Sequence, residues 1–452
     1  MQVTNTQALN EKIWPHGAYR DSDGVVRIGE LRATDLVKEF GSPVFVMDEN
    51  DFRLRAHNWR VAFEEAFGVG NVSVFYAGKA FLSVEVAKWI AQESLGLDVC
   101  TDGELAIALA GSFPPERIAF HGNNKSEVEI RQAITAGVHL IVVDSFFELE
   151  RVAREALTAG IVQKVLIRVT PGVDAHTHEF IATAHEDVKF GFSISTGAAA
   201  EAARLVIASE HLELYGLHSH IGSQIFDTEG FEIAAHRVIG LLGAIKSEHG
   251  IELQSLDLGG GYGIAYVEED DPLSPDAIAQ SLFEIVKREC DTQGLAIPHI
   301  SIEPGRAIVG PSTVTLYTVG TVKTVELDGG KARSYVSVDG GMSDNIRTAL
   351  YGAEYTAVLA NRFSKVAPTL SRVVGKHCES GDIVVRDVEL PGDVTPGDLI
   401  ATPATGAYGR SMASNYNHVT RPPVVALRAG QARLIVRRET HEDLLRLEVT
   451  EG

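Results

Sequence analysis

A lysine closes an apolar, β-prone run near the start of the chain, in the stretch SVFYAGKAF at residues 73–81. Burying an unpaired ammonium group costs several kcal/mol, so Lys79 either reaches solvent at a strand end or supplies an amine for chemistry. Considered alone, the stretch favours the first interpretation, because long cationic side chains commonly extend to water from an apolar surface. The polar residues that follow other strands decide between the two.

Three glycines follow an apolar run in DLGGGYG, at residues 259–261. Without Cβ atoms, their backbone amides can close on an anion, and the loops after the last strands of a barrel are a common phosphate site. A tight turn at a crowded barrel rim is the alternative. We favour the phosphate site, and a dinucleotide fingerprint is absent because the spacing G-x-G-x-x-G does not occur here.

Glu303 and Arg306 lie in EPGR, directly after another apolar run. A carboxylate at the end of a buried strand needs a cationic or hydrogen-bonding partner. Arg306 could be that partner within the protein. Alternatively, Glu303 binds the protonated ring nitrogen of a heterocycle while Arg306 binds an anion. The motif by itself leaves both interpretations open.

Two histidines, His218 and His220, are two residues apart in GLHSHIGSQ, so both face the same side of a strand. This spacing can hold a metal ion, but the His-x-His pair of zinc amidohydrolase barrels lies on the first strand, whereas this pair lies on the sixth. Residues 174–188 add His176, His178 and His185 without regular ligand spacing. We therefore expect no metal site, and interpret the histidines as core residues or as rings that stack on an aromatic cofactor.

Later motifs carry further reactive side chains. In GKHCESGD, polar residues surround Cys378, which suits an accessible thiol near a charged site, although isolated cysteines are most often inert core residues. A cysteine protease has no other support in the sequence. The motifs GGMSDNIRTALYG and ATGAYGRSMASNYN contribute Arg347, Tyr351, Tyr408, Tyr416 and Asn417, which could equally be packing or surface residues.

The elements that must position these residues form a repeating pattern. Between about residues 70 and 306, eight short β-rich runs alternate with amphipathic segments that end in Ala-Gly, a common helix-stop signal. This alternation predicts an α/β fold with a (β/α)8 barrel over residues 50–310. Residues 1–49 and 311–452 are richer in strands and turns, and we expect them to form one mainly β domain from both chain ends, which contributes substrate and dimer contacts.

Composition excludes several classes of function. The chain of 452 residues carries a net charge of -21, which argues against binding to nucleic acid or an anionic membrane, since both require a basic face. The N-terminal residues contain no apolar core of the signal-peptide type, and no run of 18 apolar residues occurs. Its three cysteines form no disulfide framework, so we expect a cytoplasmic protein.

Taken together, the motifs YAGKA, HGNNKS, GLHSHIGSQ, DLGGGYG, EPGR, GMSDNIRTALY, HCESGD and TGAY...MASNYN resemble the diaminopimelate decarboxylase family. That family belongs to the pyridoxal-phosphate enzymes with an alanine-racemase-like barrel. The resemblance runs from WPHGA near the N-terminus to the last hairpin, and its strength lies in the order of eight motifs. It implies decarboxylation of meso-2,6-diaminopimelate to L-lysine and carbon dioxide, the last step of lysine biosynthesis.

The resemblance also implies roles at the cofactor. Lys79 would form the Schiff base with the aldehyde of pyridoxal 5'-phosphate, His220 would stack on the ring, and Glu303 would pair with the ring nitrogen so that the ring accepts electrons. Ser223 and neighbouring glycines would bind the phosphate. The implied cofactor-binding set is Lys79, His220, Ser223, Gly260, Gly261, Glu303, Gly305, Arg306 and Tyr408.

Further roles concern the substrate. Arg306, Arg347 and Tyr351 would hold its distal carboxylate, and Glu379 its distal ammonium, with Tyr408 near both cofactor and substrate. Cys378 would donate the proton that replaces carbon dioxide. Because Cys378 and Glu379 come long after the barrel, the resemblance implies a homodimer in which each active site combines one subunit's barrel with the partner's β domain.

Other substrates stay open. Relatives with this architecture decarboxylate ornithine, arginine or carboxynorspermidine, and alanine racemase shares the barrel. Two arginines beside Glu379 favour a substrate whose far end carries a carboxylate and an ammonium, whereas diamine-forming relatives need carboxylates there. A non-catalytic relative of the fold is the remaining alternative, which the presence of Lys79, Glu303 and Cys378 disfavours.

Overall fold

The computed structural model describes residues 7–172 and 189–449. The histidine-containing segment 174–188 lies outside the described residues. The chain divides into a barrel unit (Arg55–Gly263 and Pro272–Ala307) and a β unit (Met1–Leu54, Ile264–Asp271 and Ile308–Gly452). The roles that the sequence predicts for its two domains stay predictions.

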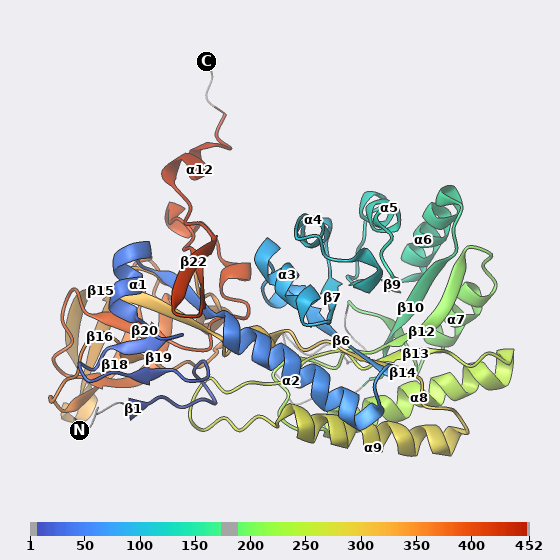
Figure 1. Cartoon of the computed structure of the whole chain (residues 1–452), viewed down its shortest axis with the longest axis horizontal. Coiled ribbons are helices and arrows are strands. Elements are labelled where there is room, and N and C mark those ends of the chain that lie inside the picture. Colours follow the sequence, from blue (N-terminus) through green and yellow to red (C-terminus); the bar gives the residue numbers. More distant parts are fainter. Residues whose placement is uncertain (1–6, 173–188, 450–452) are drawn as a thin grey trace. The chain divides into compact units, whose positions relative to one another are not determined.

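The barrel unit contains a closed sheet of eight parallel strands, which confirms the predicted fold class (Figure 1). Neighbours in sequence are neighbours in the sheet, and the barrel closes where Val165 pairs with Ile141 and Ser301 with Ser73. A short additional strand, β11 (Phe192–Ser193), pairs in parallel with the end of β10. The eight strands are β6 (Val72–Ala77), β7 (Gly96–Val99), β8 (Ile118–Phe120), β9 (Leu140–Val143), β10 (Gln163–Thr170), β12 (Leu212–His218), β13 (Ser255–Asp257) and β14 (His299–Ile302).

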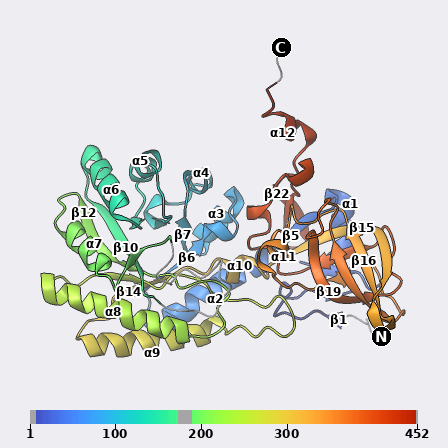
Figure 2. The ribbon, with the colours of Figure 1, turned by 180° about the vertical axis from the view of Figure 1, so that it is seen from behind.

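Helices follow the barrel strands and begin and end at residues whose side chains favour those positions. Ser126 caps one helix with a reciprocal bond to Glu129, and the two predicted Ala-Gly stops are confirmed, since Gly137 and Gly160 take up left-handed conformations. Figure 2 also shows α8 beside α9. The helices are α2 (Glu49–Phe67), α3 (Val84–Gln92), α4 (Asp102–Ala110), α5 (Glu127–Ala136), α6 (Phe146–Ala159), α7 (Ala198–Ile207), α8 (Glu229–His249), α9 (Pro275–Gln293) and α10 (Arg306–Val309).

The barrel interior is layered from polar to apolar to charged. Alternate residues of a strand share a face, so the series His299, Ser301 and Glu303 leads from one end of the barrel to the other. A buried apolar cluster forms the middle layer and consists of Phe75, Ala119, Leu140, Val142 and Leu166. This layer fills the barrel beneath the residues at the carboxyl ends of the strands. It therefore separates those residues from the opposite end of the barrel.

The β unit combines both ends of the chain around one strand. β5 (Val44–Asp48) pairs antiparallel with β15 (Thr313–Glu326) and parallel with β21 (Val424–Arg428). The sheet order is β19-β18-β16-β15-β5-β21-β22; β20 also pairs with β15, and β17 pairs with β20. The other elements are β1 (Gln7–Ala8), β2 (Tyr19–Arg20), β3 (Val26–Ile28), β4 (Leu31–Arg32), α1 (Ala33–Phe40), β16 (Ala332–Val338), α11 (Arg347–Tyr351), β17 (Val358–Leu359), β18 (Pro368–Val374), β19 (Ile383–Pro391), β20 (Leu399–Thr402), β22 (Gln431–Val436) and α12 (His441–Leu445).

Both predicted hairpins are present in the β unit. β15 and β16 pair antiparallel through the Asp-Gly-Gly turn, in which Gly329 has a φ of 79°. β21 and β22 meet at Ala429 and Gly430, which both have positive φ, as expected of the tight turns that match the twist of a hairpin. Among the helices of residues 7–172 and 189–449, none has the length and apolar character needed to cross a membrane.

The middle layer of the barrel gives a stability prediction. Leu166→Ala should lower the free energy of unfolding by about 2–5 kcal/mol, because the lost side chain leaves a cavity that the closed barrel cannot collapse. The control is Leu157→Ala on α6, where the side chain is 56% exposed. Thermal melting of both variants is the measurement, and equal effects at the two positions would contradict the layered interior.

Candidate active site

A cavity of about 390 Å³ opens at the carboxyl ends of the barrel strands, within the range of about 300–1,000 Å³ typical of small-molecule sites. It brings together Lys79, His220 and Glu303 from three different strand ends, although their roles stay predictions. His218 lines the same cavity, in agreement with the two-residue spacing that places it on one side of the strand with His220. The complete lining is Lys79, Cys100, Thr101, His121, Gly122, Asn123, Asn124, Arg168, Phe190, His218, His220 and Glu303.

Lys79 lies in a short 3-10 turn directly after β6, half-buried in the cavity wall. The hydroxyl of Tyr76 donates to the carbonyl of Phe81 at 2.7 Å and bridges this turn. A Cβ on Gly78 would lie 2.8 Å from the carbonyl oxygen of Asp98 on β7, so only glycine lets the turn pass this close to the neighbouring strand. The glycine before Lys79 therefore sets the position of the amine.

The glycine loop after β13 packs its backbone against neighbouring loops. A Cβ on Gly261 would lie 2.3 Å from the carbonyl oxygen of Gly222, and the amide of Gly260 donates to Nδ1 of His220 at 3.1 Å. On the same side of the barrel, Nη2 of Arg306 donates to Oγ of Ser223 at 2.8 Å. Glycine backbone, a hydroxyl and a guanidinium group are the features expected of a phosphate site, so these residues fit the phosphate of pyridoxal phosphate.

Glu303 faces two imidazole rings rather than open solvent. Nε2 of His218 lies 3.1 Å from its Oε1 atom, and Nε2 of His121 lies 3.4 Å from the same atom. Burial raises the pKa of Glu303, but His121, His218 and Lys79 outweigh this effect and hold that pKa well below its usual range. A buried carboxylate at the cavity wall is suited to bind a cationic ring nitrogen, as the sequence predicts.

Buried polar atoms without a hydrogen-bond partner gather at this cavity, among them Nε2 of His121, Oε1 of Glu303 and Oδ2 of Asp98. Such atoms are rare in native interiors and usually indicate a missing polar ligand or water. The nitrogens of His121 and His218 and an oxygen of Glu303 also lie within 4.8 Å of one another, a spacing that could hold a metal ion. The expected absence of a metal stays a prediction.

Two charged residues, one in the cavity wall and one buried beside it, were not predicted from the sequence. Arg168 on β10 lies in the wall, over the ring of Phe190 at 4.2 Å and with its Nη1 atom 3.7 Å from Oδ2 of Asp144. Asp98 on β7 is buried beside His121. The signal that singled out Lys79, a charged residue in a buried strand, is present in both VLIRVTP and LGLDVCT, and it could have found them.

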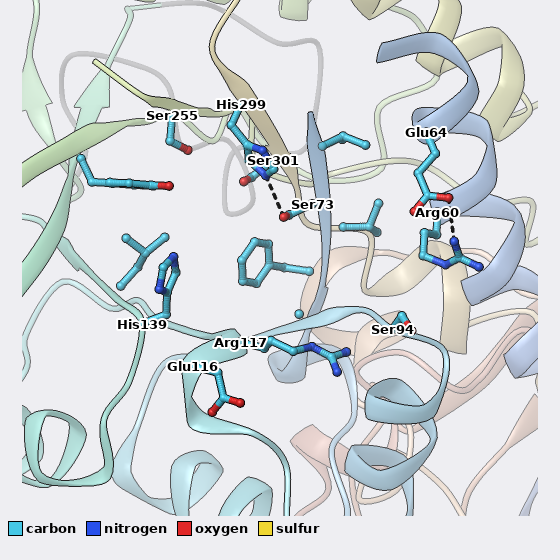
Figure 3. A pocket seen from close by; sticks show the side chains of 16 residues that line it. Arg60, Glu64, Ser73, Ser94, Glu116, Arg117, His139, Ser255, His299 and Ser301 are labelled. Carbon is cyan, nitrogen blue, oxygen red and sulfur yellow. Dashed lines mark hydrogen bonds and ion pairs between the residues drawn. The ribbon is translucent and has the colours of Figure 1, made fainter. Parts of the chain in front are cut away.

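A second, smaller cavity of about 180 Å³ lies at the opposite ends of the strands (Figure 3). Its polar groups include Ser73, Ser255, Ser301, His139 and His299, with Ser73 hydrogen-bonded to Nε2 of His299 at 2.8 Å. Burial lowers the pKa of His299, so its ring stays neutral at pH 7. We interpret this cavity as the polar end layer of the barrel, because none of the predicted catalytic residues lines it.

In the β unit, three sequence motifs meet around His377. Its Nε2 atom lies 2.8 Å from Oγ of Ser343, its Nδ1 atom lies 3.1 Å from Oδ1 of Asn417, and its ring stacks on Tyr416. These contacts join the loop after β16, the loop between β18 and β19 that carries Cys378, and the glycine-rich loop at residues 403–418. The fold therefore gathers motifs that are separated by up to about 75 positions in the sequence.

Asp382 fixes the loop that carries Cys378. One carboxylate oxygen accepts the amide of Met342 at 2.6 Å, and the other accepts the amide of His377 at 2.7 Å. Gly341 and Gly375 pack against the same carboxylate, where a Cβ on either glycine would lie 2.5 Å or less from an oxygen. The buried carboxylate thus joins the first two motif loops. Sequence reasoning missed Asp382, although it is the last residue of HCESGD.

Arg347 begins α11 and is buried among aromatic rings of the β unit. Its Nη1 atom donates to the hydroxyl of Tyr355 at 2.5 Å, and its guanidinium carbon lies 4.6 Å from the ring centre of Tyr266. Tyr351 ends the same helix, as the four-residue spacing predicts. Tyr408 has a φ of 60°, a strained conformation for a non-glycine residue that is often found at functional sites.

Cys378 and Glu379 are exposed. All residues that line the larger cavity come from the barrel unit, whereas Arg347, Tyr351, Cys378, Glu379 and Tyr408 belong to the β unit. The predicted roles of these five residues toward the contents of the cavity stay predictions.

The two-sided bonding of Asp382 gives a prediction. Asp382→Asn replaces one accepting oxygen with a donor, which should cost about 1–3 kcal/mol of local stability and loosen both loops. Hydrogen exchange at the amides of Met342 and His377 measures this effect. The control is Asp387→Asn on β19, the strand that directly follows Asp382, where the carboxylate is half-exposed and pairs with Arg333. Unchanged protection of both amides in the Asp382 variant would contradict the proposed link.

Comparison with known proteins agrees with this geometry. A family described as "Pyridoxal-dependent decarboxylase, pyridoxal binding domain" matches residues 49–310. The chain is 57% identical over 445 residues to a diaminopimelate decarboxylase of Mycobacterium tuberculosis, covering 98% of both chains. It is 51% identical over 453 residues to one of Corynebacterium efficiens, covering 99% of this chain and 98% of the relative.

Solved structures show the same likeness. The fold matches the crystal structure of the diaminopimelate decarboxylase of M. jannaschii in complex with L-lysine, with a TM-score of 0.88 and 31% identity over 95% of this chain and 97% of that one. The geometry agrees with these relatives, since Lys79 directly after β6 and the buried Glu303 line one cavity. The chain therefore belongs to the diaminopimelate decarboxylase family of pyridoxal-dependent enzymes.

Proposed function

We propose that the protein decarboxylates meso-2,6-diaminopimelate to L-lysine and carbon dioxide with pyridoxal 5'-phosphate as cofactor. One observation carries the proposal: Lys79, His220 and Glu303 line one cavity beside a phosphate-type cradle of glycines, in a chain 57% identical to a diaminopimelate decarboxylase. An amine, a ring-sized space, a carboxylate and an anion cradle are the four features that this cofactor requires. The predicted cytoplasmic location suits a biosynthetic enzyme.

Within the barrel, each residue has a physical task. When bound, the cofactor supplies an electron sink for the carbanion left by loss of carbon dioxide. The amine of Lys79 would hold the cofactor through a covalent linkage. Glu303 binds the ring nitrogen as an anion, and His220 packs on the ring face, with Nδ1 held by the amide of Gly260. Ser223, Gly260, Gly261, Gly305 and Arg306 bind the phosphate end.

Substrate choice would rest on the β unit. Arg347 is buried and already oriented by Tyr266 and Tyr355, so its guanidinium group can bind a distal carboxylate with little loss of side-chain entropy. Tyr351 and Arg306 assist it, Tyr408 contacts cofactor and substrate, and Glu379 binds the distal ammonium. Ornithine carries no distal carboxylate, and it would leave the buried cation of Arg347 without its partner.

Lys79→Ala tests the proposal. The variant should lose the visible absorbance of the cofactor–lysine linkage, and turnover should fall by about a thousandfold or more, because Lys79 is the only lysine among the described residues that line the cavity. The control is Lys88→Ala on α3, where the exposed amine pairs with Glu85. Purified wild-type protein is incubated with pyridoxal phosphate and either meso-diaminopimelate or L-ornithine, and lysine and carbon dioxide are assayed.

The same assay separates the alternatives. Equal activity on ornithine would contradict the assigned substrate, and cofactor binding without carbon dioxide release from either compound would indicate a non-catalytic relative. A Lys79→Ala variant that retains the visible absorbance would show that another lysine is the anchor.

We further propose a homodimer with composite sites, in which Cys378 and Glu379 act on the partner subunit's barrel. Cys378 would supply the proton that replaces carbon dioxide. The support is the exposure of both residues in a unit that also exposes apolar side chains, since Tyr416 beside His377 is 40% exposed and Leu350 on α11 is 44% exposed. An exposed thiol can control proton transfer only where water is excluded, and a second subunit would exclude it.

Complementation tests the composite site. Lys79→Ala and Cys378→Ala should each be nearly inactive as homodimers. After dissociation, mixing and reassociation, half of the dimers should pair the two variants and carry one site with both residues intact, so activity should return to about one quarter of the wild-type value. If heterodimers form and activity does not return, each site is built within one chain.

A further inference from the structure

Two buried histidines have no task in the proposed function. His121 follows β8 and His218 ends β12, and both rings lie in the charged layer of the barrel. Their Nε2 atoms lie 3.4 and 3.1 Å from the same oxygen, Oε1 of Glu303. The two rings pack edge to face, with centres 5.0 Å apart and planes at 74°. Two strands far apart in sequence thus present one nitrogen each to a single carboxylate oxygen.

This arrangement divides the carboxylate into two ends. Oε1 is fully buried and faces the histidines, whereas Glu303 as a whole lines the ligand cavity. A carboxylate has two oxygens and about four lone-pair directions, so neutral imidazoles at one oxygen leave the other available to a ligand. The histidine pair, which lines the same cavity as Glu303, then limits the directions in which the second oxygen can point.

Asp98 completes the cluster and decides where the negative charge resides. Its Oδ1 atom lies 3.7 Å from Nε2 of His121, and its Oδ2 atom is buried without a hydrogen-bond partner. Burial and the neighbouring Glu303 raise the pKa of Asp98 well above its ordinary value, whereas the pKa of Glu303 is held low. Two nearby acids in one dry site cannot both ionise cheaply, so the charge is concentrated on Glu303.

The charges around the cluster do not favour a metal ion there. Lys79 and Arg168 already act on the cluster as cations, and together with burial they lower the pKa of His121. The same burial lowers the pKa of His218, so both rings are neutral at pH 7. A further divalent cation would be repelled by both basic groups, whereas one protonated ring nitrogen adds a single charge next to Glu303.

We propose that His121 and His218 are positioning residues: once the cofactor is bound, their ring N–H groups donate to Oε1 of Glu303, keep that carboxylate ionised, and turn its other oxygen toward the ring nitrogen of the cofactor. The proposal rests on the proposed function only in requiring that pyridoxal phosphate binds in this cavity. A purely structural role would make the histidines replaceable by any residue that fills the space.

The test uses a readout that packing alone would not change. Wild type, His218→Asn, His121→Asn and the double variant are loaded with pyridoxal phosphate that carries 15N at the ring nitrogen, and the 15N resonance is recorded. We expect the protonated nitrogen of the wild type to move toward the unprotonated position, most strongly in the double variant. The control is His139→Gln, a half-buried histidine at the opposite end of the barrel, which should leave the resonance unchanged.

A double-mutant cycle separates positioning from general damage. His218→Asn should lower turnover about tenfold or more in the wild-type background but less than about twofold in Glu303→Gln, because the imidazole then has no carboxylate to hold. Should the asparagine variants fail to fold or load, His218→Gln and His121→Gln repeat the measurement; their side-chain amide reaches further toward Oε1, so their 15N resonance should move less from the wild-type position than the loss of the donor would cause.

Three results would overturn the proposal: an unchanged 15N resonance in folded, loaded variants, equal losses of turnover in both backgrounds, or a stoichiometric divalent metal in the purified enzyme that is lost on replacing the histidines. Failure of the proposed function is distinguishable, since it would appear as a wild-type enzyme that binds the cofactor and releases no carbon dioxide from meso-diaminopimelate. The 15N readout stays valid in that case.

Discussion

The need to keep buried charge paired dominates the carboxyl end of the barrel. Asp98, Asp257 and Glu303 are buried within one layer, beside the cations of Lys79 and Arg168. Isolated charges at such depth would each cost several kcal/mol, and removing one partner would leave another uncompensated. The apolar layer beneath keeps water from reaching these groups through the barrel, so their mutual interactions are strong. The same conditions make the layer a strong binding site for a charged aromatic ligand.

Close backbone packing supports this layer. Gly78 passes the carbonyl of Asp98, Gly260 passes the carbonyl of Glu303, and Gly261 passes the carbonyl of Gly222, each at a distance that no Cβ atom could share. These contacts place the cavity residues on loops that the sheet itself holds in position. Loops packed this closely hold Lys79 and Glu303 at the wall of one cavity.

In the β unit, too, a buried carboxylate holds loops in position. Asp382 binds amides from two loops, and His377 joins the third through Ser343 and Asn417. Both units therefore use a buried acidic group with several partners to fix the geometry of functional loops. In the barrel that acidic group also lines the cavity, whereas in the β unit it holds the loop that carries the exposed Cys378 and Glu379.

The sequence alone determined the local elements and the reactive residue types. Strand alternation, Ala-Gly helix stops and the Asp-Gly-Gly turn depend on neighbouring residues, so the eight barrel strands and both hairpins could be predicted, as could Lys79, His220 and Glu303 as cavity candidates. Which side chains meet was decided only by the tertiary structure. Barrel closure brings His121 and His218 to one oxygen of Glu303, and the β sheet brings Asp382 to Met342. These contacts join residues tens to hundreds of positions apart, and their geometry depends on sheet register and loop packing, which no local pattern encodes.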